Sequence, residues 1–158
     1  MNDYGILHEM NGRYALQFER FFTLHPESIF KTVTNPDVFI QWYPFATGKM
    51  ELKPGGKIAF DDGEGSTYEG IITEFEPPLV FAFREVDDLL EIELQPVDDG
   101  CRLIFTHTFD DRSMAVSTAA GWHQCLDVLS MIVNGNSVKW PNKSAELREA
   151  YSNAFHLN

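Results

Sequence analysis

Apolar and polar residues alternate along the second half of the chain. In residues 90–95, Leu, Ile and Leu alternate with Glu, Glu and Gln, and a similar alternation runs from Cys101 to Phe109. This period of two predicts antiparallel strands with one buried and one solvated face. Short apolar runs separated by Pro, Gly or Asp predict strands at 14–24, 48–52, 57–62, 67–76, 79–86, 89–97 and 101–109.

Helical spacing of apolar residues occurs between the first two of these strands. Residues 25–35 and 35–44 each predict a short helix, because Pro26 and Pro36 suit a first helical turn and Asn35 can cap the second helix.

The long helix is predicted at about residues 113–134. One apolar stripe runs along it, comprising Ala115, Ala119, Trp122, Leu126, Leu129 and Val133. His123 lies at the edge of this stripe, so we expect it to be partly exposed. Gly121 in the helix interior costs roughly 1 kcal/mol relative to Ala. We expect it either to let a neighbouring group approach the helix or to relieve crowding beside Trp122.

This order of elements predicts the architecture. A curved antiparallel sheet needs a cover for its concave face, and the long helix is the large apolar element left to provide it. We therefore predict an α+β helix-grip fold with about six to seven strands, two short helices and one long C-terminal helix across the concave face. The domain is expected at 13–136, with an N-terminal extension at 1–12 and a C-terminal extension at 137–158 that forms a short helix.

Several segments carry a family resemblance. They are "PDVFIQWYP" (36–44), "LKPGGKIAF" (52–60), "YEGIITEFEPPLVFAF" (68–83), "GCRLIFTHTF" (100–109) and "GWHQCLDVL" (121–129). In order and spacing they resemble the START-like superfamily, also called SRPBCC, in the branch related to the activator of the heat-shock-protein-90 ATPase. That resemblance implies a helix-grip fold with a space for an apolar ligand between helix and sheet. The superfamily also contains cyclases, hydrolases and co-chaperone domains, so the fold alone does not define the function.

The resemblance implies a set of candidate ligand-binding residues facing that space. They are Trp42, Phe60, Phe81, Phe83, Ile92, Phe105, His107, Trp122 and Leu126. Walls of pockets and of cores use the same residue types, so a filled core is the alternative for this set. Trp42 and Tyr43 either guard the mouth of the cavity or pack the second short helix on the sheet.

His107 is the most informative polar residue. It is in phase with Leu103 and Phe105 and therefore points inward. It can be a hydrogen-bonded core residue, a polar anchor for a ligand or a catalytic base. His123 could be its neighbour across the gap.

Composition narrows the classes of partner. The chain has 158 residues, enough for one domain, and a net charge of −12, which opposes binding to nucleic acid or anionic membranes. No apolar run is long enough for membrane insertion, and the first residues lack a signal-peptide pattern, so we expect a cytoplasmic protein. Cys101 and Cys125 are expected to be buried, reduced thiols.

Motifs for metals, cofactors and catalysis are not recognised. The histidines lack metal-ligand spacing, "FDDGEG" at 60–65 is interpreted as a solvated hairpin turn, and "KPGGK" at 53–57 joins strands instead of opening a helix. There is no GxSxG motif. We expect no metal, no cofactor and no assigned catalytic residue.

Three function classes remain, and each predicts a different structure. A binding module for a small apolar or amphipathic molecule should contain a closed apolar cavity. A protein-interaction domain with a chaperone partner should have a filled core and an exposed apolar patch. A cyclase or hydrolase should place His107 beside a carboxylate or hydroxyl group. A homodimer is compatible with the sequence but not required by it.

Overall fold

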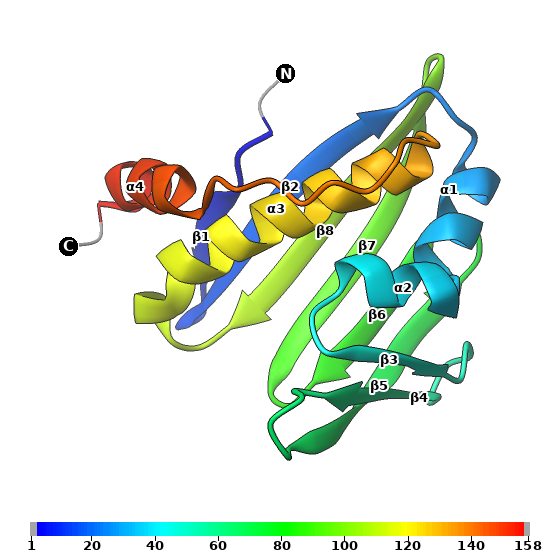
Figure 1. The fold of residues 1–158 in the computed structure, drawn as a ribbon, viewed down its shortest axis with the longest axis horizontal. Coiled ribbons are helices and arrows are strands. Elements are labelled where there is room, and N and C mark those ends of the chain that lie inside the picture. Colours follow the sequence, from blue (N-terminus) through cyan, green and yellow to red (C-terminus); the bar gives the residue numbers. More distant parts are fainter. Residues whose placement is uncertain (1–2, 157–158) are drawn as a thin grey trace.

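An eight-stranded antiparallel sheet forms the body of the protein (Figure 1). The structure is a computed structural model, and it describes residues 3–156. The strands are β1 (Ile6–Met10), β2 (Arg13–Phe22), β3 (Ala46–Met50), β4 (Lys57–Asp61), β5 (Thr67–Glu76), β6 (Val80–Glu85), β7 (Asp88–Val97) and β8 (Gly100–Phe109). Their order across the sheet is β1-β2-β8-β7-β6-β5-β4-β3. The predicted α+β helix-grip fold is therefore confirmed.

The helices lie on one face of this sheet. They are α1 (Pro26–Thr34), α2 (Pro36–Trp42), α3 (Ala115–Val133) and α4 (Ser144–Phe155), and a single 3₁₀ turn (Arg112–Met114) leads into α3. Figure 1 shows α3 running diagonally across the sheet, with α1 and α2 beside it on the same side. Inward residues of β8 are buried and outward ones are not, which is the pattern expected when helices cover one face.

The sheet has more strands than the sequence predicted because an additional strand forms before the first predicted one. Ile6–Met10, expected to be an N-terminal extension, pairs with β2 as an edge strand. The two strands join through Asn11 and Gly12, which both have positive φ angles (52° and 81°). Asn-Gly is the preferred pair for such a two-residue hairpin turn.

Gly121 does not have the role expected from the sequence. It lies on the exposed side of α3, and a Cβ atom added there would meet no other atom within 4 Å. Neither close approach nor crowding at this point accounts for the glycine. Trp122 beside it does point between helix and sheet, as predicted, and is buried.

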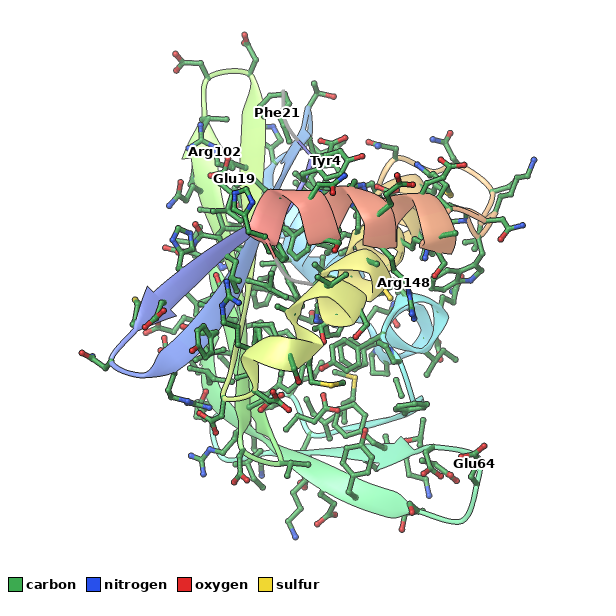
Figure 2. The ribbon with its side chains drawn as sticks, turned by 90° about the vertical axis from the view of Figure 1, so that its left-hand side faces the viewer. Tyr4, Glu19, Phe21, Glu64, Arg102 and Arg148 are labelled. Atoms are coloured by element: carbon green, nitrogen blue, oxygen red, sulfur yellow. The ribbon has the colours of Figure 1, made fainter. Side chains whose placement is uncertain are left out.

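The C-terminal segment folds back along α3. Residues 134–143 run beside α3 in the reverse direction and lead into α4, which packs on α3 (Figure 1). The buried residues of α4 are Leu147, Tyr151 and Phe155. Viewed from the side, Figure 2 shows α4 crossing over α3 with Tyr4 close to it, and the Tyr4 and Tyr151 rings are 5.3 Å apart.

This docking explains why the prediction for His123 is wrong. His123 is only 5% exposed. Its Nδ1 atom lies 2.8 Å from the hydroxyl of Tyr151, which also accepts a hydrogen bond from the amide of Gly5 at 2.8 Å. The edge of the α3 stripe is therefore covered by α4, and His123 is not the neighbour of His107.

Candidate functional site

A cavity of about 510 Å³ opens at the end of the sheet where α3 begins. It lies among the α2–β3 connection, the β6–β7 turn, the end of β8 and the first turns of α3, which meet at the same end of the sheet in Figure 1. Its volume falls within the range of about 300–1,000 Å³ that is typical of small-molecule sites. The residues that line it are Tyr43, Pro44, Phe45, Glu85, Val86, Asp87, Asp88, Leu90, His107, Phe109, Asp110, Asp111, Met114, Thr118 and Trp122.

The inner wall of the cavity is aromatic and apolar. Tyr43, Leu90, Phe109 and Trp122 all line it and are all at least nine-tenths buried. The rings of Tyr43 and Trp122 lie 5.2 Å apart. Such a wall removes the apolar part of a ligand from water, which is the main source of affinity in small-molecule sites.

His107 connects this wall to the β6–β7 turn. Trp122 Nε1 donates a hydrogen bond to His107 Nδ1 at 2.8 Å, and His107 Nε2 lies 2.8 Å from Asp88 Oδ2. Because an indole nitrogen only donates, Nδ1 must carry the lone pair. The ring proton is therefore on Nε2, which donates to the carboxylate of Asp88. Both ring nitrogens are used, and the imidazole holds Trp122 and Asp88 in place.

A second polar group lies beside it. Glu85, the last residue of β6, accepts hydrogen bonds from two phenols: Tyr43 donates to Oε1, and Tyr68 donates to Oε2 at 2.9 Å. Burial and the neighbouring Glu85 carboxylate raise the pKa of Tyr43 well above its usual value. The same two causes, burial first, raise the pKa of Tyr68. Both phenols therefore stay protonated and keep the Glu85 carboxylate in position.

Exposed apolar side chains surround the mouth. Phe45, Val86 and Met114 come from three separate segments, and they are 52%, 69% and 52% exposed. Phe45 and Val86 also have positive φ angles, 64° and 56°. A β-branched residue in this region is a genuine outlier, and strain of this kind gathers at functional sites.

The predicted site residues divide into two groups. His107 and Trp122 line the cavity. The others lie in the closely packed interior behind it and are at most 2% exposed; they are Trp42, Phe60, Phe81, Phe83, Ile92, Phe105 and Leu126. There, aromatic rings fill the space between helix and sheet, for example the rings of Phe39 and Tyr43, stacked at 4.6 Å.

The space between the centre of α3 and the sheet, which we call the middle of the grip, is therefore filled by side chains. The cavity lies at the end of the grip, where α3 begins. Tyr43 lines this cavity, whereas Trp42 packs on the ring of Phe39 at 5.6 Å. Sequence reasoning missed Glu85 and Asp88. The available signal was the turn "EVDD", in which Val stands where a hairpin prefers Gly or Asn.

Both cysteines and the acidic segment at 60–65 lie away from the cavity. Cys101 and Cys125 are free and buried, as predicted, and burial raises the pKa of the Cys125 thiol to about 12. The "FDDGEG" segment is the β4–β5 turn, with Glu64 at its tip (Figure 2), and the Asp62 carboxylate accepts from backbone amides there. Within residues 3–156, no three His, Cys, Asp or Glu side chains group in a way that could hold a metal ion. No helix in that range is long and apolar enough to cross a membrane.

The fold is shared with solved structures. A conserved protein of unknown function from Enterococcus faecalis, EF2215, superposes with a TM-score of 0.82 at 16% identity, over 96% of this chain and 90% of that one. CalU16 from Micromonospora echinospora superposes with a TM-score of 0.72 at 21% identity, over 95% and 94% of the two chains. Identities this low show the fold alone, and they define the chain as a helix-grip protein.

The family follows from the sequence. The family model described as "Activator of Hsp90 ATPase homolog 1-like protein" matches residues 23–134. The chain therefore belongs to the Activator of Hsp90 ATPase homolog 1-like family, as the resemblance predicted. No curated protein matches the sequence.

Proposed function

We propose that this protein binds a small amphipathic molecule in the cavity at the end of the grip. The observation that carries the proposal is the cavity itself. It has about 510 Å³ of space, a buried aromatic inner wall and a few oriented polar groups, a combination typical of ligand sites. The family and its fold support a binding role without indicating the ligand.

Binding is favoured over catalysis by the state of His107. A general base needs a free lone pair within hydrogen-bond reach of the proton that it removes. Here Nδ1 accepts from Trp122, and Nε2 donates to Asp88. Although His107 does lie beside a carboxylate, as an enzyme would require, it must first break the bond to Trp122 to act as a base. Its arrangement suits a residue that orients the wall of a binding site.

A protein-interaction role is the second candidate, and one observation favours it. Phe45, Val86 and Met114 form an exposed apolar patch, while the core behind it is filled. A chaperone ATPase partner would cover that patch. In this case, substitutions on the patch would weaken capture of the partner, and blocking the cavity interior would not.

The test uses the tryptophan in the cavity wall as a reporter. The chain has three Trp residues, so Trp42→Phe with Trp140→Phe leaves Trp122 alone. Its fluorescence is recorded while fatty acids, sterols, aromatic polyketide-like compounds and alkyl amines are titrated. We expect a saturable change with at least one class.

A blocked variant locates that binding. Thr118 lines the cavity, so Thr118→Phe should fill it, whereas Ser117→Phe adds the same bulk one residue away, outside the lining. We expect loss of binding in Thr118→Phe and retention in Ser117→Phe. A flat response across all ligands would contradict the proposed function, and so would binding that survives in a folded Thr118→Phe variant.

A further inference from the structure

The charged residues of the cavity are all of one sign. Its lining includes five carboxylates, which belong to Glu85, Asp87, Asp88, Asp110 and Asp111, and it includes no Lys or Arg. A cation in contact with this lining is Arg13, whose Nε lies 2.6 Å from Asp110 Oδ1 and whose guanidinium also donates to the backbone carbonyl of Asp87 at 2.9 Å. Arg13 therefore balances one carboxylate of the group and leaves an excess of negative charge at the mouth.

Hydrogen bonds fix the positions of several of these carboxylates. Glu85 accepts from two phenols, and Asp88 accepts from His107. Asp111 accepts from the amide and hydroxyl of Ser113, and these bonds lower the pKa of its carboxyl group. In contrast, the hydrogen bond from Arg13 to Asp87 is made to the backbone carbonyl of Asp87.

Burial separates the cavity into two zones. Asp87, Asp110 and Asp111 are exposed, whereas Leu90, Phe109 and Trp122 are buried. The apolar zone is therefore inside and the negative zone is at the rim. A ligand that satisfies both has an apolar body and a positively charged head.

We propose that the ligand is a cationic amphipath, an organic ammonium group attached to an apolar body. This inference rests on the proposed function and specifies its ligand class. The ammonium head lies among the rim carboxylates, and Coulomb attraction stabilises it there. The same carboxylates repel the carboxylate of a fatty acid. Neutral amphipaths bind through the apolar zone alone.

The experiment compares ligands that differ only in the head. Decyltrimethylammonium, decanol and decanoate share one alkyl chain and are titrated below their micelle concentrations, with Trp122 fluorescence as the readout. We expect the ammonium to bind at least about tenfold more tightly than decanol, decanoate to bind weakest, and added salt to reduce the ammonium advantage.

Two variants assign the effect to the rim. Asp87→Asn should weaken ammonium binding severalfold and leave decanol unchanged. Asp98→Asn removes the same charge from the exposed β7–β8 turn, outside the cavity lining, and should change neither ligand. It therefore controls for the net charge of −12.

The outcomes separate this inference from the proposed function. If decanol binds as tightly as the ammonium, or decanoate binds best, the cationic ligand class is wrong and the binding function stands. Equal losses in Asp87→Asn and Asp98→Asn, or ammonium binding that survives in Thr118→Phe, would mean adsorption to an acidic surface and would also overturn the inference. If none of the three ligands binds, and the wider panel is also flat, the proposed function itself fails.

Discussion

The middle of the grip and its open end are built from the same kinds of residue but do different things. Under the centre of α3, Phe105 contacts the rings of Phe18, Trp42 and Trp122 and is fully buried. Phe109 lies four residues further along β8 on the same face, and it borders a cavity of about 510 Å³. The difference is that packing partners surround the first ring, whereas the second has open space on one side. Aromatic residues in the sequence therefore identify the interior of this fold, but they do not identify the cavity.

The largest expected effect tests this difference directly. Phe105→Ala should lower the free energy of unfolding by about 3–5 kcal/mol, because it leaves a void in a filled core. Phe109→Ala, with identical chemistry on the same strand and face, should cost roughly 1–2 kcal/mol less, because its ring already lacks partners on the cavity side. Urea unfolding followed by circular dichroism measures both. Equal losses would mean that the end of the grip is packed as tightly as its middle.

The next effect concerns the hydrogen bond that links the cavity wall to the sheet. Trp122→Phe keeps an aromatic ring but removes the donor to His107 Nδ1. A buried acceptor left unpaired costs about 1–3 kcal/mol, so we expect a loss in that range. His107 Nδ1 then has no donor, whereas Nε2–H still donates to Asp88, so nitrogen NMR of the imidazole should show a shifted Nδ1 resonance. An unchanged Nδ1 resonance would contradict the role assigned to Trp122.

Much of the fold could be predicted because its signals are local. Alternation in Leu90–Leu94 and in Cys101–Phe109 defines strand faces, and helical spacing defines α3. The strand at Ile6–Met10 was also within reach, since Asn11–Gly12 is a strong hairpin signal that lacked only a longer apolar run before it.

The site was less predictable because it depends on contacts between distant segments. His107 lies opposite Leu90, so Asp88, two residues before Leu90 on the same face, becomes its diagonal neighbour. That register cannot be derived from one sequence. The burial of His123 likewise depends on α4 returning to cover α3, and a helical wheel of α3 alone does not contain that information.

A smaller effect distinguishes the covered histidine from the one at the cavity. Burial lowers the pKa of His123, and nearby Arg20 and Lys143 act in the same direction, whereas Asp127 and Asp3 oppose them. The folded state therefore binds the proton less tightly than the unfolded state. Its contribution to stability is present above the unfolded pKa of about 6.5 and is lost as the pH falls through the lower folded value.

This sign gives a measurable difference between variants. Between about pH 7.5 and pH 5.5 the wild type should lose more stability than His123→Gln, as followed by thermal unfolding. His8→Gln, at an exposed position of β1, should behave like the wild type. An identical pH dependence in all three proteins would show that His123 is not kept neutral by the docking of α4.

The smallest effect has opposite signs for stability and for binding. Val86 has a φ of 56° and is 69% exposed, so its position in the β6–β7 turn strains the backbone without contributing to the core. Val86→Gly removes a strain of about 1–2 kcal/mol and adds about 0.5–1 kcal/mol of unfolded-state entropy, so the variant should be as stable as the wild type or up to about 1.5 kcal/mol more stable. Affinity for an apolar ligand should nevertheless fall severalfold, because Val86 lines the mouth of the cavity.

Asn11→Gly, in the β1–β2 turn outside the cavity lining, is the matched control that should leave binding unchanged. If Val86→Gly raised stability and left affinity intact, the strain at this turn would have no connection with the cavity.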